Sequence, residues 1–296
     1  MTPHADGHVV SVVIPTVNRG SLDRTLEAMK AQTRPPDAVV VVEDTGRRGP
    51  SWARNEGIRR SRGDLIAFTD DDCVPPPDWL ERLIDAVDRH GADGAGGTLL
   101  ETDPLLADKR RRRVIPDSEE IDTIGRVGDT ANLMYRRSVL ADCEATDGYV
   151  FDERFGVFGS EDGELAWRVR RRGALLVFVP NGVIHLRTTT AWSFLVHQFR
   201  RGRGIGLLYL AHRRIGGFFQ IGNSLLWGSA GRSRLKWPRA FLRKGLGPFD
   251  AGSFHSFPAF LLFWIGAKAE ALGFFRELIR SHRTFRSSGD GAKEGR

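Results

Sequence analysis

The sequence predicts an α/β fold with a mostly parallel central sheet flanked by helices. Three short runs of strand-forming residues, at 9–14, 39–42 and 65–69, are separated by segments with helical spacing. Such alternation is typical of parallel sheets, whose strands are buried on both faces and therefore read as continuous apolar runs. All three runs end in polar or acidic residues. Because ligands bind beyond the carboxyl ends of strands in open α/β sheets, these ends predict one shared crevice.

The elements around the first two runs carry recognisable boundary signals. A polar loop, 15–20, follows the first run, and Ser21 is placed to cap a helix whose apolar residues recur at helical spacing. Prolines stop this helix before the second strand, which ends at Glu43 and Asp44. A glycine-rich turn then leads to a helix around residues 52–60 and to the third strand.

The third strand stops at three consecutive carboxylates, Asp70, Asp71 and Asp72, and the prolines at 75–77 prevent it from continuing. Like charges this close repel one another unless a cation offsets them. Asp70 and Asp72 form an Asp-x-Asp arrangement whose hard oxygen atoms suit Mg²⁺ or Mn²⁺. The alternative is a solvated acidic turn, favoured by the amino end of the helix that follows. These residues alone do not decide between the two.

The next part of the chain predicts the second half of the domain. Glycines lead to a strand around 98–100, and residues 101–126 predict a long loop because they lack periodicity and contain a run of basic residues. Residues 131–135 predict a return to the sheet. A helix at 165–172 and two short strands within 175–185 follow.

The character of the sequence changes near residue 191, where aromatic, glycine and arginine residues interleave without strand alternation. We therefore expect a catalytic domain at 1–190, a helical extension at 191–286 and a disordered tail at 287–296. Between 260 and 280, apolar residues recur at the spacing of an amphipathic helix. A helix on a membrane surface and a helix docked on the domain share this pattern, and the surrounding arginines and tryptophans favour the membrane.

Composition and charge restrict the classes of protein and ligand. With 296 residues, 41% hydrophobic and 27% charged, the chain can bury a sizeable core. Lys and Arg number 44 against 37 Asp and Glu, and this net charge of +7 favours phosphate-bearing ligands, an anionic membrane surface or nucleic acid. We expect no nucleic-acid partner, because the basic runs are far apart and no nucleic-acid motif accompanies them. Two cysteines without a disulfide framework, and a polar start unlike a signal peptide, indicate a cytoplasmic protein.

Taken in order, these segments resemble an inverting family-2 glycosyltransferase with the GT-A (nucleotide-diphospho-sugar transferase) fold. The matching segments are 12–19, 43–44, 53–57, 68–72, 151–153 and 161–168, followed by Pro180 and His185. The resemblance implies a nucleotide-sugar-binding half at about 9–100 and an acceptor half at about 101–190. Two departures are present. Glu43 replaces a commoner aspartate, and the Gln198-x-x-Arg201 segment lacks the tryptophan of processive synthases, which points to addition of a single sugar.

The resemblance also assigns roles to individual residues. The implied nucleotide-sugar site consists of Thr16, Asn18, Glu43, Asp44, Arg54, Asp70 and Asp71, and the implied metal ligands for Mn²⁺ or Mg²⁺ are Asp70, Asp72 and His185. Taken alone, His185 fits a buried strand histidine and Arg54 fits a surface ion pair. Asp162 is the expected general base, with Glu161 as the alternative base or as a ligand of the metal or acceptor. One base without a carboxylate nucleophile predicts inversion by in-line displacement.

The predicted function is transfer of a sugar from a nucleotide-diphospho-sugar, preferably a UDP-sugar, to a hydroxyl of a glycan, a lipid-linked or a small-molecule acceptor. A protein with this function would be cytoplasmic, either free or peripheral on the inner face of the membrane. A sugar-phosphate nucleotidyltransferase is disfavoured because no glycine-rich phosphate loop follows the first strand. A catalytically silent sugar-nucleotide-binding protein is the remaining alternative, and retention of Asp70, Asp72 and Asp162 argues against it.

Overall fold

The computed structural model of the chain describes residues 7–17, 20–103, 117–123, 125–212, 265–266 and 268–280. Asn18, the basic run of the predicted long loop, the predicted tail and most of the predicted extension lie outside these residues. The chain divides into two compact units, residues 1–157 with 161–188, and residues 158–160 with 189–296. This division lies near the predicted boundary at residue 190, although the assignment of domains stays a prediction.

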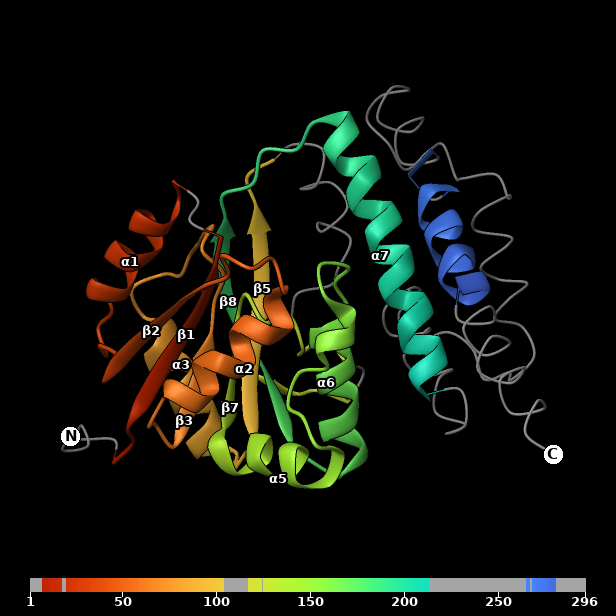
Figure 1. Cartoon of the computed structure of the whole chain (residues 1–296). Coiled ribbons are helices and arrows are strands. Elements are labelled where there is room, and N and C mark those ends of the chain that lie inside the picture. The colour runs from red at the N-terminus through yellow and green to blue at the C-terminus, as the bar shows by residue number, and fades with distance from the viewer. Residues whose placement is uncertain are drawn as a thin grey trace. The chain divides into compact units, whose positions relative to one another are not determined.

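The first unit is built on a sheet with the strand order β2-β1-β3-β7-β5-β8-β4, and β6 pairs with β8 (Figure 1). The strands are β1 (Val10–Thr16), β2 (Ala38–Glu43), β3 (Leu65–Phe68), β4 (Cys73–Val74), β5 (Gly94–Glu101), β6 (Glu120–Ile121), β7 (Leu133–Arg136) and β8 (Leu176–His185). The helices of this unit are α1 (Leu22–Lys30), α2 (Pro50–Arg60), α3 (Trp79–Arg89), α5 (Arg137–Asp147) and α6 (Glu161–Arg171), with a short 3-10 helix at Glu153–Phe155.

The expected α/β fold, with a central sheet flanked by helices, is confirmed. Strand β1 pairs in parallel with β2 and β3, as the three N-terminal runs predicted. The rest of the sheet is more mixed than expected, because β7 lies antiparallel between β3 and β5. The reason is that β5 ends at Glu101, beside His185 at the end of β8, and β7 begins at Leu133, beside Phe68 at the end of β3. A strand that starts at the edge where its neighbours end must run in the opposite direction.

Several boundaries differ from the predicted ones. The two short strands expected within 175–185 form one strand, β8, and the glycines expected to precede a strand belong to β5. Helix α5 was not predicted. Ser21 and Asp78 occupy the N-cap positions of α1 and α3, but neither side chain makes a capping hydrogen bond.

Side chains alternate between two hydrophobic layers, one on each face of the sheet. Val12 and Ile14 of β1 pack with α1 and α3, whereas Val13 packs with residues from α2, α5 and α6. Helix α2 approaches β1 so closely that a Cβ on Gly57 would lie 2.3 Å from Cγ1 of Val13. Only glycine permits this approach, which holds α2 against the strand that leads to the predicted crevice.

The second unit contains α7 (Ala191–His212) and a helical segment at 268–280. The two pack closely through glycines, since a Cβ on Gly202 would lie 1.9 Å from the carbonyl oxygen of Glu270. Arg203 Nε donates to Glu277 Oε2 over 2.9 Å. The amphipathic pattern therefore covers α7 with one face, while Leu272 and Ile279 remain 64% and 56% exposed. Among the helices that the structure describes, none has the length and hydrophobicity needed to cross a bilayer.

His8, just before β1, contacts Asp64, just before β3, and Asp88 on α3; we call these three residues the histidine clamp. His8 Nδ1 lies 2.5 Å from Asp64 Oδ2, and His8 Nε2 lies 2.9 Å from Asp88 Oδ1 on α3. Burial lowers the pKa of His8, but hydrogen bonds to the two carboxylates raise it by more, so its pKa lies above the ordinary value of 6.5.

Replacing His8 with Gln should make the protein less stable at pH 6 but have a smaller effect at pH 9. Because the pKa of His8 is higher in the folded state than in the unfolded state, protonation of His8 stabilises the folded protein. This stabilisation is complete below the unfolded-state pKa of about 6.5, and it is lost as the pH rises through the folded-state pKa. The partners are half exposed, so the effect is on the order of 1 kcal/mol or less. The measurement is the difference in Tm between wild type and His8→Gln at both pH values. Because both proteins retain all other titrating groups, an equal difference at pH 6 and pH 9 would contradict the clamp.

Candidate active site

A buried arginine connects the end of β3 with the start of α6. Arg54 of α2 donates from Nη1 to Glu161 Oε1 over 2.7 Å and from Nη2 to Asp70 Oδ1 over 2.9 Å. The Arg54 and Glu161 side chains are only 5% and 6% exposed. The surface ion pair considered as an alternative for Arg54 is therefore wrong, and the pair is a buried one. Three segments that are distant in sequence, α2, the residues after β3 and the start of α6, meet at this point.

The electrostatics of this cluster affect Asp162 most strongly. Burial, together with the charges of Glu161 and Asp129, raises the pKa of Asp162 to about 8, while Arg54 and the Gly163 backbone N–H oppose this rise. The pKa of Asp70 is also raised, mainly by burial, although Arg54 opposes it. A carboxylate with a pKa near neutral pH is suited to exchanging a proton with a bound substrate.

A second group of side chains lies at the ends of β5 and β8 and just before β4. His185 Nε2 faces Asp72 Oδ1 at 3.3 Å, and His185 Nδ1 lies 3.0 Å from Glu101 Oε2. Sheet register explains the arrangement, because His185 is paired with Cys73 on one side and with Glu101 on the other. Burial lowers the pKa of His185, but both carboxylates raise it by more, to about 9. The ring is therefore held by acids rather than buried among apolar side chains.

The donor set at this group fits a divalent cation. Ligand atoms of Asp72, Cys73 and His185 all lie within 4.8 Å of one another. Burial raises the pKa of the Cys73 thiol, so this residue remains protonated and is a poor ligand. A carboxylate oxygen suits Mn²⁺ or Mg²⁺, and an imidazole is a common ligand of divalent transition metals. Glu101 fixes the orientation of the ring as carboxylates do for metal-bound histidines. Asp70, the third predicted ligand, is instead paired with Arg54.

Among the predicted nucleotide-sugar residues, Thr16, Glu43, Asp44, Asp70 and Asp71 lie at the same edge of the sheet, but two of their carboxylates hold loops. Thr16 Oγ1 donates to Asp71 Oδ2 over 2.7 Å, and this bond links the end of β1 to the residues after β3. Asp44 accepts hydrogen bonds from the backbone N–H groups of Arg48 and Gly49 at the start of α2. Glu43 is exposed. No contact of Asn18 is described.

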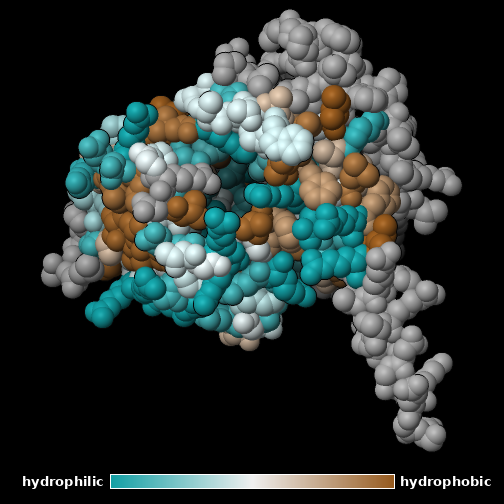
Figure 2. Space-filling model, turned by 45° about the horizontal axis from the view of Figure 1, so that its top comes forward, coloured by the Kyte–Doolittle hydropathy of each residue, from teal (hydrophilic) through white to brown (hydrophobic). Residues whose placement is uncertain are grey.

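Figure 2 views the molecule with the upper end of Figure 1, where these strands end, turned toward the reader, and hydrophilic side chains cover much of this face.

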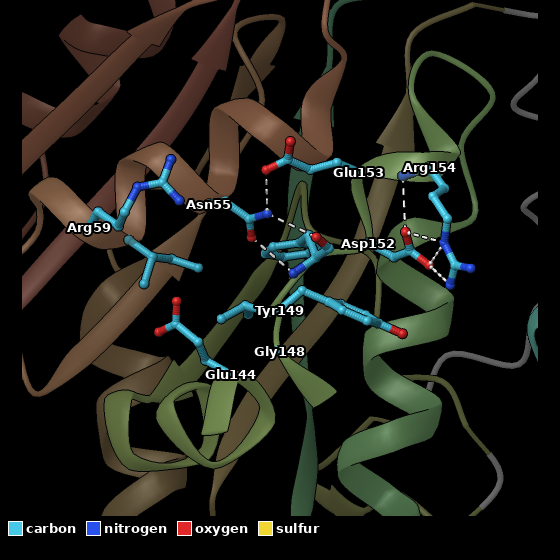
Figure 3. Close-up of a pocket in the computed structure, with 11 residues that line it drawn as sticks. Asn55, Arg59, Glu144, Gly148, Tyr149, Asp152, Glu153 and Arg154 are labelled. Atoms are coloured by element: carbon cyan, nitrogen blue, oxygen red, sulfur yellow. Dashed lines mark hydrogen bonds and ion pairs between the residues drawn. The ribbon is translucent and has the colours of Figure 1, made fainter. Parts of the chain in front are cut away.

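A separate pocket of about 290 Å³ lies between α2, α5 and residues 148–154 (Figure 3). It includes Phe151, Asp152 and Glu153 of the predicted acceptor region, and Asn55 Nδ2 donates to Glu153 Oε1 over 3.0 Å. It contains none of the predicted catalytic or metal-binding residues.

Sequence reasoning missed two acidic residues at this edge. Glu101 ends a strand in the same way as Glu43 and Asp70, so the rule used for the first three strands had the signal to find it. Asp129 lies in an aperiodic stretch that predicts only a loop, and its proximity to Asp162 depends on tertiary packing.

Residues 44–144 match the model of glycosyl transferase family 2. This part of the chain is therefore similar to glycosyl transferase family 2. Its relatives include glycosyltransferase AglE of Haloferax volcanii, 27% identical over 193 residues that make up 64% of this chain and 60% of AglE. Succinoglycan biosynthesis protein ExoO of Rhizobium meliloti is 33% identical over 150 residues, or 49% of this chain and 40% of ExoO.

The solved structure of GalNAc-T7 with UDP, GalNAc and Mn²⁺ has a similar fold. Its TM-score is 0.51 at 15% identity, and the match covers 72% of this chain and 50% of that chain. This similarity supports a GT-A fold for this chain. The chain spans only 60% of AglE and 40% of ExoO, so these relatives extend beyond the shared region.

Replacing Glu101 with Gln should weaken Mn²⁺ binding by about 10- to 100-fold, because carboxylates that orient ligating histidines have effects of this size. The measurement is calorimetric titration of Mn²⁺ in the presence of UDP. Glu144→Gln, at an exposed position of α5, serves as the control for the lost charge. Equal Mn²⁺ affinities of Glu101→Gln and wild type would rule out the orienting role.

Proposed function

We propose that this chain is a metal-dependent glycosyltransferase that moves one sugar from a nucleotide-diphospho-sugar to a hydroxyl group. The observation that carries the proposal is the bridge made by Arg54 between Asp70 and Glu161. This bridge brings the acids after β3, which suit a donor diphosphate and its cation, next to the helix that carries Asp162. The family 2 match supports the same reaction class.

In this proposal, Asp72 and His185 hold Mn²⁺ or Mg²⁺, with Glu101 fixing the imidazole ring. When bound, the cation neutralises negative charge on the leaving diphosphate. Asp70 stays next to Arg54, whose buried guanidinium places a positive charge beside it. Thr16 and Asp71 shape the loop that receives the nucleotide, and Asp44 fixes the turn before α2.

Asp162 acts as the general base. Its carboxylate takes the proton of the acceptor hydroxyl while the hydroxyl oxygen forms a bond to the anomeric carbon. The bond from that carbon to the diphosphate oxygen breaks, and the leaving diphosphate keeps the electron pair. Glu161 cannot move freely to replace Asp162 as the base, because its Oε1 is held by Arg54. A single displacement at the anomeric carbon inverts its configuration.

The substrates are proposed from similarity. A UDP-sugar is the favoured donor, and the structural neighbour GalNAc-T7 was solved with UDP and Mn²⁺. A glycan or lipid-linked acceptor is favoured, since the relatives include ExoO and a glucosyl-dolichyl phosphate glucuronosyltransferase of Haloferax volcanii. The exposed Leu272 and Ile279 support peripheral association with an anionic membrane surface.

Replacing Asp162 with Asn should reduce transfer by about 10²- to 10⁴-fold, the usual contribution of general base catalysis. Binding of UDP with Mn²⁺ should survive, because the substitution leaves the metal-binding residues intact. In wild type, activity should fall as the pH drops through the raised pKa of Asp162, well above the ordinary range of aspartate. Steady-state rates across pH and calorimetry provide the readouts. Equal losses of UDP binding and turnover would contradict the base role.

Replacing Asp72 with Ala should abolish the enhancement of UDP binding by Mn²⁺, since it removes the carboxylate that faces His185. Calorimetric titration of UDP with and without Mn²⁺ measures this effect. Asp85→Asn on the exposed face of α3 is the control for a lost charge. A variant that still shows the full Mn²⁺ enhancement would exclude Asp72 as a ligand.

A further inference from the structure

Strands β5 and β8 run side by side, and a bulge interrupts their parallel ladder (Figure 1). The pairing of Gly96 with Phe178 is followed by the pairing of Thr98 with Gly182, so one residue of β5 faces three residues of β8. The bulge therefore shifts the register of β8 against β5 by two residues. Because this shift is even, the later side chains of β8 stay on their own faces of the sheet.

This register shift decides which residue lies opposite His185. Beyond the bulge, His185 is paired with Glu101, and His185 Nδ1 lies 3.0 Å from Glu101 Oε2. If the register before the bulge continued, Glu101 would instead lie opposite Val183. Two residues of a strand span about 6.6 Å, so the imidazole ring would lose the carboxylate that orients it. The proposed cation site therefore depends on the bulge.

The side-chain amide of Asn132, just before β7, bridges the two strands at the bulge. Its Nδ2 donates to the Thr98 carbonyl of β5 over 2.9 Å and to Asn181 Oδ1 of β8 over 3.0 Å. Trp79 Nε1 of α3 donates to Asn132 Oδ1 over 2.9 Å. An indole N–H can only donate, so Asn132 must turn its oxygen toward Trp79 and its NH₂ group toward the strands. Both asparagines are buried, so water does not replace these bonds.

The bridge fits because residue 97 is glycine. A Cβ on Gly97 would lie 1.9 Å from Asn181 Oδ1 and 2.8 Å from Asn132 Nδ2. Any larger residue at this position would therefore displace the amide pair. The Gly97 N–H also donates to the Asn132 carbonyl over 3.2 Å. Asn132 thus holds the bulged part of β5 through its backbone and its side chain.

A role in stability alone explains the amide pair less well than a role at the cation site. Asn181 Nδ2 is buried and makes no hydrogen bond within the part of the chain that the structure describes. A buried donor in this state costs stability, so this residue type is a poor choice for a purely structural position. Bulges beside active sites re-aim side chains, and Asn181 precedes His185 by four residues of the same strand.

We infer that Asn132 and Asn181 are positioning residues for the cation, because their amide pair holds the bulge that places His185 opposite Glu101. Neither residue touches the cation. This role rests on the proposed function, in which His185 is a ligand of Mn²⁺ or Mg²⁺. It adds that the orientation of this ligand is set in the interior of the sheet, between β5 and β8, and not only by the acids around it.

The test observes the cation and its ligand directly, in the full chain without an added histidine tag, loaded with Mn²⁺ and UDP. Calorimetry measures the Kd of Mn²⁺, and pulsed EPR detects the hyperfine coupling of an imidazole nitrogen bound to Mn²⁺. Asn132→Ala and Asn181→Ala each remove one half of the amide pair, and His185→Ala gives the spectrum without the ligand. Leu140→Ala is the matched control, because Leu140 is buried in the hydrophobic layer on α5, away from the bulge.

We expect Asn132→Ala and Asn181→Ala to weaken Mn²⁺ binding by about 10- to 100-fold, the usual effect of residues that orient a metal ligand. The nitrogen coupling should be lost or strongly reduced, as in His185→Ala, while weak binding through Asp72 remains. Leu140→Ala should also lower Tm, because it leaves a cavity. It should nevertheless keep the Mn²⁺ affinity and the nitrogen coupling of wild type.

Three results would overturn the role of the amide pair. Wild-type Mn²⁺ affinity and nitrogen coupling in both Asn variants, with only Tm lowered, would make the pair purely structural. Equal losses of affinity and coupling in Leu140→Ala would trace them to general destabilisation. Failure of both Asn variants to fold would make the pair a requirement of the fold.

Failure of the proposed function gives a different result. A wild-type spectrum without nitrogen coupling, or a coupling that persists in His185→Ala, refutes His185 as the metal ligand of the proposed function. That result appears before any Asn variant is compared, and the role of the amide pair fails with it.

Discussion

The architecture of the candidate site depends on the ion pairs of Arg54. Its guanidinium is buried and lies between carboxylates from β3 and α6, which are more than 90 positions apart in sequence. A buried charge that loses its partner destabilises a protein by about 3–5 kcal/mol, so each of these residues requires the others. Gly57, one turn later on α2, allows the helix to approach β1 closely enough for Arg54 to reach both acids. Packing and electrostatics therefore fix the same geometry.

The N-terminal part of the fold could be predicted because its signals are local. Apolar runs, prolines and terminal acids identify β1, β2 and β3 and the edge where they end. The direction of β7 could not be predicted in this way, because it depends on where β5 ends and not on the residues of β7 itself. Likewise, the glycines of β5 have no strand signal; they are accommodated because β7 approaches closely, and a Cβ on Gly96 would lie 2.8 Å from the Asn132 carbonyl.

The candidate site shows the same division between local and tertiary information. Asp70, Asp71 and Asp72 are visible in the sequence as a charge cluster, but their different partners are not: Arg54, Thr16 and His185, respectively. The sequence around His185 favours a histidine buried in a strand. Only the register of β8 with its neighbouring strands places His185 between two acids. Asp129 has no local signal, since its surroundings are supplied by β3 and α6.

The order of strands in the sheet has a consequence for how such a protein can diversify. Strands β2, β1 and β3 are contiguous both along the chain and across the sheet, and they end at most of the acids assigned to the donor. Strands β7, β5 and β8 are permuted, and within the described residues the ladder of β3 with β7 joins them to that block. The proposed metal site crosses this ladder, because Asp72 follows β3 and His185 ends β8. A chimaera that exchanges the chain from β7 onward between relatives would therefore take Asp72 from one parent and His185 from the other, so both parents would have to supply compatible halves of one cation site.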